Sequence, residues 1–208
     1  MIESILTVTS AANVFDLTTV ADVKSDLGIT GSTYDTILAR YVTESSVDLA
    51  SACNRVFARE TLSELFRLAA DRPSLQLRRW PVSSITSVTV DGTGLASTDY
   101  EVDAESGLLW RLNGDCRIDW PGGKVVVVYV AGYDLAGSVS TNAPKDLQKA
   151  ARAIVKAQYL SRGRDPLVKS ESVPGVYDVA YWVGGLPGGE AWPADIKAVL
   201  NRYTQQLF

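Results

Sequence analysis

The chain contains no histidine, which removes the side chain most often used as a general base and as a zinc ligand. It has only two cysteines, Cys53 and Cys116, and their spacing matches no zinc motif. Two isolated thiols fit a reducing cytoplasm. We also find no P-loop and no nucleophile elbow. These absences predict that the protein is not an enzyme and that it uses no cofactor or metal.

Long apolar runs and an excess of basic charge are also missing. No run approaches the roughly 20 residues that a membrane-spanning helix needs. The opening MIESILTVTS has neither the basic start nor the apolar core of a secretion signal. The net charge is −4, and phosphate binding needs clustered cations, so wrapping of nucleic acid is not expected. A mildly acidic chain suits the lining of a passage through which DNA slides.

What the sequence does contain is a block of short strands between Leu75 and Tyr133. Apolar and polar side chains alternate along three of its segments, which is typical of half-buried antiparallel strands: Asp99–Asp103, Leu108–Leu112 and Cys116–Trp120. Turn residues mark the expected chain reversals: Asp91-Gly92, Ser106-Gly107 and Pro121-Gly122-Gly123. The β-branched run from Val125 to Val130 predicts a central strand covered on both faces.

Two further strands are expected before this block. A short one is predicted over Ile5–Val8. Arg59–Leu68 alternates and predicts the first strand of the block, although Glu64 interrupts its apolar row. The charged residues Asp99, Glu101 and Asp103 resemble a cation site only superficially, because alternate residues of a strand form a charged outer face and no EF-hand-like loop follows.

Four helices are expected around the strands. The first has Thr18 as its N-cap and ends at Gly28, and the second runs from Ser32 or Thr33 to about Asn54. The other two begin at Pro144 and Pro193, because proline is favoured at helix starts. The predicted fold class is therefore α+β: a small helical bundle, formed by residues 1–58 and 134–208, with an antiparallel β-sheet module inserted at 59–133. A long loop is predicted at 163–192.

The third helix carries a basic stripe, which we define as Lys145, Lys149, Arg152 and Lys156. Their spacing of four, three and four places them on one side of a helix. A solvated face is the ordinary interpretation of such a stripe. The alternative is a contact with a neighbouring subunit or with phosphate passing through a channel.

The order of these segments resembles that of phage head-tail connector (adaptor) proteins, a group that includes gene-transfer-agent adaptors. LTTVADVKSDLGI is similar to their opening helix, and LRRWPVSSITSVTVDG with DYEVD is similar to the β-insert of one branch. VVYVAGY followed by PKDLQKAARAIVKAQYLSRG resembles the strand-to-helix passage of that branch. VKSESVPGVYDVAYW resembles its later loop, so the likeness spans most of Leu17–Trp182.

The resemblance implies a structural role in the virion neck after assembly in the host cytoplasm. Subunits of that family form a ring, roughly twelve-fold, by closed cyclic symmetry. The ring docks under the portal, extends the channel for genomic DNA and receives the tail or a stopper protein. On this basis, neighbour or tail contacts are expected from residues of the long loop: Lys169, Glu171, Tyr177, Tyr181 and Trp182.

The last helix has two possible partners for its apolar stripe. Members of the resembled family dock their C-terminal segments onto the portal, which makes a set of apolar residues candidates for portal binding: Trp192, Ile196, Leu200, Tyr203, Leu207 and Phe208. The alternative partner is the chain's own bundle, because tertiary packing is the usual source of helix stability.

Two other functions stay open at the level of sequence. One is a tail-completion or baseplate-like protein that binds a different ring. The other is a small hydrolase or glycan-binding module with a site formed by Trp80, Trp110 and Trp120. The ordinary role of such tryptophans is to fill cores and interfaces.

Overall fold

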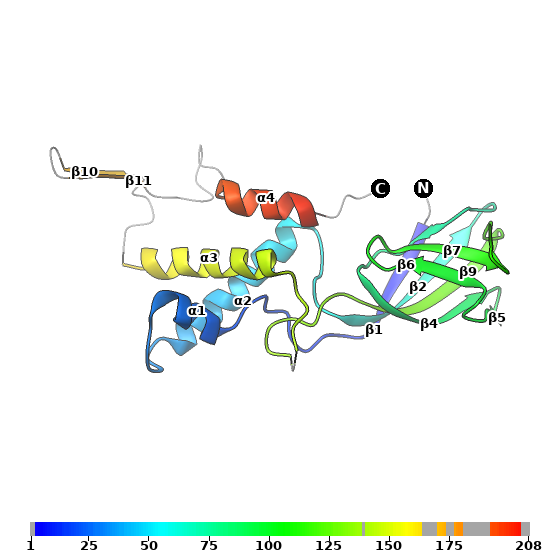
Figure 1. Cartoon of the computed structure of the whole chain (residues 1–208), viewed down its shortest axis with the longest axis horizontal. Helices are drawn as coiled ribbons and strands as arrows, with labels where there is room; N and C mark the ends of the chain where they lie inside the picture. The colour runs from blue at the N-terminus through cyan, green and yellow to red at the C-terminus, as the bar shows by residue number, and fades with distance from the viewer. Residues whose placement is uncertain (1–2, 139, 164–169, 174–176, 181–191, 205–208) are drawn as a thin grey trace. The chain divides into compact units, whose positions relative to one another are not determined.

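The computed structural model describes residues 3–138, 140–163, 170–173, 177–180 and 192–204. The chain divides into two compact units (Figure 1). The β unit comprises residues 1–14 and 56–142, and the helical unit comprises residues 15–55 and 143–207. The fold is α+β, as the sequence predicts. Residues 3–14 belong to the β unit, whereas the sequence predicts them in the helical bundle.

The β unit contains two antiparallel sheets. The larger one has five strands in spatial order: β1 (Glu3–Ser10), β2 (Glu60–Leu68), β9 (Gly123–Ala131), β4 (Val82–Val90) and β5 (Thr93–Gly94). The smaller one has β7 (Leu108–Asn113) paired with three strands: β3 (Leu75–Gln76), β6 (Tyr100–Asp103) and β8 (Cys116–Ile118). The predicted strands at Ile5–Val8 and Arg59–Leu68 are therefore present, the first one longer than expected.

The core of the β unit is built from side chains of both sheets. Phe66 from β2 and Tyr129 from β9 are buried in one cluster with Leu109 from β7 and with Trp120. The prediction of a central strand covered on both faces at Val125–Val130 is right in its first part and wrong in its second. Strand β9 is the central strand, but only alternate residues are buried, while Val126, Val128 and Val130 on its other face are half-buried.

Each expected reversal is found. Asp91 and Gly92 have positive φ values of 48° and 86° and join β4 to β5, while Gly107 lies between β6 and β7. Gly132, which ends β9, was not singled out by sequence. Its φ is +105°, and a Cβ there would approach the Ala58 carbonyl oxygen to 2.3 Å. Glycine is therefore required at this position, where the chain leaves the sheet.

The helical unit contains four helices within the described residues: α1 (Val20–Leu27), α2 (Asp35–Ala52), α3 (Lys145–Ser161) and α4 (Ala194–Tyr203). Helix α3 contacts the other three. Val23, Leu38, Val42 and Val155 form a buried cluster shared by α1, α2 and α3. None of the described helices has the length and hydropathy needed to span a membrane.

The ends of α1 show how the sequence selects its boundaries. Gly28 adopts the left-handed conformation and ends the helix, as predicted. The N-cap is Thr19 and not Thr18, because Thr19 Oγ1 accepts a hydrogen bond from the Asp22 amide at 3.1 Å. The preceding segment is held by Ser46 of α2, whose Oγ accepts from the Leu17 amide at 2.9 Å.

Candidate functional site

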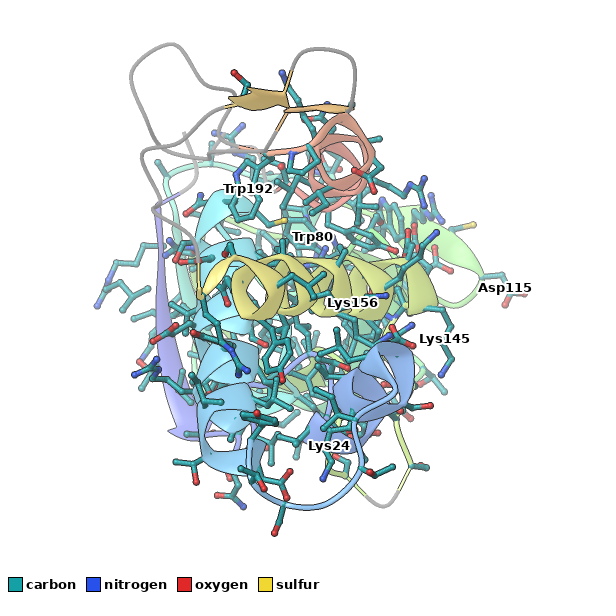
Figure 2. All side chains as sticks on the ribbon, turned by 90° about the vertical axis from the view of Figure 1, so that its left-hand side faces the viewer. Lys24, Trp80, Asp115, Lys145, Lys156 and Trp192 are labelled. Carbon is teal, nitrogen blue, oxygen red and sulfur yellow. The ribbon has the colours of Figure 1, made fainter. Side chains whose placement is uncertain are left out.

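The basic stripe is only partly available for contacts outside the subunit. Arg152 Nε donates to Asp26 Oδ2 at 3.1 Å, which links α3 to α1. Lys145 and Lys149 are exposed, and Lys156 is half-buried. Lys145 and Lys156 both extend from α3 (Figure 2). The structure therefore assigns Arg152 to packing within the helical unit and leaves the three lysines as candidates for intermolecular contact.

The apolar stripe of α4 packs within its own unit. Ile196 and Leu200 are only 4% and 5% exposed. The Tyr203 hydroxyl donates to Asp146 Oδ1 of α3 at 2.9 Å, and Arg202 forms an ion pair with the same carboxylate. Cys53, whose pKa is raised by burial, lies with its Sγ 3.9 Å from the Leu200 carbonyl oxygen. Because Ile196 and Leu200 are buried and α4 contacts α3, these observations favour the alternative in which the chain's own bundle covers this stripe. Portal binding by the stripe stays a prediction.

The remaining portal candidates are less fully defined. Trp192, labelled in Figure 2, precedes α4 and is half-buried. Leu207 and Phe208 lie outside the described residues.

The predicted long loop contains a two-stranded hairpin. Strand β10 (Ser170–Val173) pairs with β11 (Tyr177–Ala180), so that Glu171 lies opposite Val179 and Val173 opposite Tyr177. The stretch predicted as a loop therefore contains two paired strands among its described residues. Lys169, Tyr181 and Trp182 lie outside the described residues.

The three tryptophans do not form an open site. Trp120 is fully buried, and its Nε1 donates to the Leu109 carbonyl oxygen at 3.2 Å. The ring of Trp110 is covered by the Arg117 guanidinium, whose carbon lies 4.0 Å from the ring centroid. Trp80, labelled in Figure 2, is half-buried, and the peptide bond that joins it to Pro81 is cis. A sugar ring stacks on exposed aromatic faces, so this arrangement does not support the glycan-binding alternative.

The acidic side chains of β6, Glu101 and Asp103, bind other side chains and backbone groups of the β unit. Glu101 forms an ion pair with Arg117. Asp103 accepts hydrogen bonds from the Ser106 hydroxyl at 2.6 Å and from the Glu105 amide at 3.1 Å, and these bonds lower its pKa. Among the residues that the structure describes, no group of three or more histidine, cysteine or acidic side chains is arranged to hold a metal ion.

Sequence reasoning missed a buried polar network around Glu64. This side chain interrupts the apolar row of β2 yet is fully buried. Its carboxylate accepts from Ser4 Oγ at 2.7 Å, from the Arg78 amide at 3.0 Å and from the Tyr129 hydroxyl at 2.8 Å. Burial raises the pKa of Glu64. The signal in the sequence is the position of Glu64, two residues from Leu62 and from Phe66 on the inward face.

Comparisons with known proteins find a similar fold in solved structures. No family model matches the chain, and no curated protein matches it. Among solved structures, a chain from "Neck of empty GTA particle computed with C6 symmetry" matches with a TM-score of 0.55 and 17% identity. A chain from "Neck of native GTA particle computed with C12 symmetry" matches with a TM-score of 0.53 and 17% identity.

A third match comes from "Virion of native gene transfer agent (GTA) particle", with a TM-score of 0.52 and 16% identity. Each match covers 98% of this chain and 97% of the other. Because the alignments extend over both units, the likeness concerns the whole combination of a helical bundle and an inserted β module. The chain therefore has the fold of a protein found in the neck of a gene transfer agent particle.

Proposed function

We propose that this protein is a structural neck component of a tailed phage or phage-like particle, located between capsid and tail. It acts as a head-tail adaptor: copies form a ring under the portal, extend the DNA channel and receive the tail through a terminator or stopper protein. The role involves no catalysis. Genomic DNA passes through the lumen without sequence recognition.

One observation carries this proposal, namely the fold shared with the neck structures over 98% of the chain. Its support lies in the combination of parts, since a helical bundle interrupted by a β module is more specific than either part alone. The printed C6 and C12 symmetries belong to those neck structures, and they motivate a cyclic ring here. The net charge of −4 is compatible with a channel lining along which DNA slides without binding tightly.

Ring formation on the portal tests the proposal. The purified chain is mixed with the portal protein of the same particle, and the mixture is examined by native mass spectrometry and negative-stain microscopy. We expect a closed ring of copies on one end of the portal. The chain alone and the portal alone serve as controls.

Two results would count against this function. One is a stable dimer as the sole species of the chain, unchanged when portal is added. The other is binding to a baseplate ring of the same particle with no binding to portal, which would support the tail-completion or baseplate-like alternative instead.

A further inference from the structure

Strand β1 is an edge of the five-stranded sheet, and among the described residues it has a strand partner, β2, on one side only. Its residues from Ser4 to Ser10 include no charge and no proline. Ile5 and Val8 are 56% and 43% exposed. Monomeric proteins usually guard such an edge with lysine, proline or a covering segment, because unpaired N–H and C=O groups recruit another strand.

The opposite edge of the same sheet is also partly open. Strand β5 pairs only with Thr89 and Val90 of β4. Residues 83–87 of β4 have no strand partner on that side in the described part of the chain, and all of them except Ile85 are exposed serines or threonines. The pairing of β4 with β9 has two register irregularities in this stretch, between Val82 and Ser84 and between Ile85 and Ser87. Within the described residues, the sheet therefore has an uncharged stretch of edge without a strand partner at each end.

The two free edges run in opposite directions. Each strand from β1 through β2 and β9 to β4 is antiparallel to its neighbour, so β4 runs opposite to β1. A second copy in the same orientation would therefore bring its β1 antiparallel to β4 of the first. Such a contact is head-to-tail, and repeated around a rotation axis it closes a ring.

Strand β1 is also held in place before any partner arrives. It pairs with β2 along its length, and Ser4 Oγ donates to the buried Glu64 carboxylate at 2.7 Å. A strand that is already ordered loses little conformational entropy on pairing. Main-chain hydrogen bonds then supply affinity without requiring complementary charges.

We propose that neighbouring copies join edge to edge through their β units, with β1 of one copy pairing antiparallel to residues 83–87 of β4 in the next. The occupant of each edge is a second copy of this chain, because a ring of identical subunits brings one edge of each kind to every junction. Residues 4–10 of β1 and residues 83–87 of β4 carry no charge that would oppose this pairing. This inference rests on the proposed ring and specifies its interface.

Disulfide crosslinking between introduced cysteines tests this contact. The particles are assembled so that every copy of this chain is the cysteine variant. In a Cys116→Ser background, Thr7→Cys on β1 is combined separately with Ser83→Cys, Ser84→Cys or Thr86→Cys on β4. After mild oxidation, we expect a ladder of covalent multimers from at least one double variant. The single variants should give no ladder, because each then presents only one of the two edges.

The outcomes separate this inference from the proposed function. If microscopy locates a ring of the chain in the necks and no pair yields a ladder, edge pairing is wrong and the ring proposal stands. Covalent dimers from Thr7→Cys alone would mean that two β1 strands pair with each other, which also overturns it. If the chain is absent from the necks, the proposed function fails and the inference fails with it.

A charge placed on the edge provides an independent measurement. Thr7→Lys adds the kind of residue that guards natural edges, whereas Ser97→Lys adds the same charge to an exposed turn of the same unit. We expect ring assembly on the portal to fall several-fold for Thr7→Lys and to be unchanged for Ser97→Lys, with equal melting temperatures. Equal assembly by both variants would overturn the inference.

Discussion

At the scale of single residues, the buried Glu64 shows most clearly how the strands of the β unit are held together. A buried carboxylate is costly unless its oxygens are hydrogen-bonded, and here both oxygens accept bonds, from Ser4, the Arg78 amide and Tyr129. The network ties β1 and β9 to β2, since these three donors come from segments far apart in the chain. Its function is therefore positional, and it fixes the register of the sheet.

Two substitutions at Glu64 distinguish the stability contributed by its hydrogen bonds from the stability contributed by its charge. Glu64→Leu leaves the Arg78 amide and the Tyr129 hydroxyl without their acceptor, so we expect a loss of about 1–3 kcal/mol of unfolding free energy. Glu64→Gln keeps an acceptor for both donors, and its amide group can donate to Ser4. Urea unfolding near neutral pH should rank Glu64→Gln well above Glu64→Leu, and the reverse order would contradict the assigned network.

The pH dependence of Glu64 has a definite sign. Burial raises its pKa in the folded state, so the stability it contributes is full below the unfolded-state pKa and is lost as pH rises through the folded pKa. The stability of Glu64→Gln relative to wild type should therefore increase from about pH 4 to about pH 8. Glu105→Gln, on an exposed turn, is the control. A difference that is flat with pH would show that this ionisation is not coupled to folding.

Among the elements, α4 shows how packing settles what periodicity leaves open. Its apolar residues at positions 196 and 200 indicated an amphipathic helix but did not say which surface covers them. In the structure that surface belongs to the helical unit, and Asp146 of α3 binds both Arg202 and Tyr203. A helix stabilised by its own unit does not need the portal to form.

Truncation of one α4 side chain measures this packing. Leu200→Ala removes a buried side chain, so we expect a loss of about 2–5 kcal/mol of unfolding free energy. Asn201→Ala, exposed on the same helix, should change stability by about 0.5 kcal/mol or less. Thermal unfolding of the free chain compares the two. Equal melting temperatures would mean that α4 is not part of the folded core.

The lysines of the basic stripe give a prediction about assembly. Because Lys145 and Lys149 are exposed while Arg152 is paired with Asp26, we expect Lys145→Glu with Lys149→Glu to weaken ring assembly or DNA retention without altering the monomer fold. Arg72→Glu with Lys124→Glu makes the same charge change on exposed residues of the β unit and is the control. If particles carrying the lysine variant package DNA and join tails normally, the basic stripe serves only as a solvated face.

Much of the fold could be predicted from local chemistry. Glycine and proline positions gave the turn at Asp91-Gly92 and the end of α1 at Gly28, because those conformations restrict the residue locally. The burial of α4 and the pairing of Arg152 with Asp26 could not be predicted, since they depend on partners far apart in sequence. For the same reason Glu64 looked like an interruption, although its donors lie 14, 60 and 65 residues away.

At the scale of the whole molecule, the proposed function requires many copies of this chain to assemble into one ring. Of the chain's residues, 46% are hydrophobic and 21% are charged, an ordinary balance for a globular domain. We expect a monomer or a weak oligomer in isolation and a ring on the portal. Light scattering over a range of concentrations checks the free chain. A tight dimer at the lowest concentration would contradict this expectation.

The most direct test of the central claim is an image of the assembled particle with this chain located. Cryo-electron microscopy of particles carrying a small tag on the chain, compared with untagged particles, gives its position. We predict extra density on a ring between the portal and the tail, with copies repeated around the axis and enclosing an open channel. Extra density at the baseplate or on the capsid shell, or no density in the neck, would contradict the account.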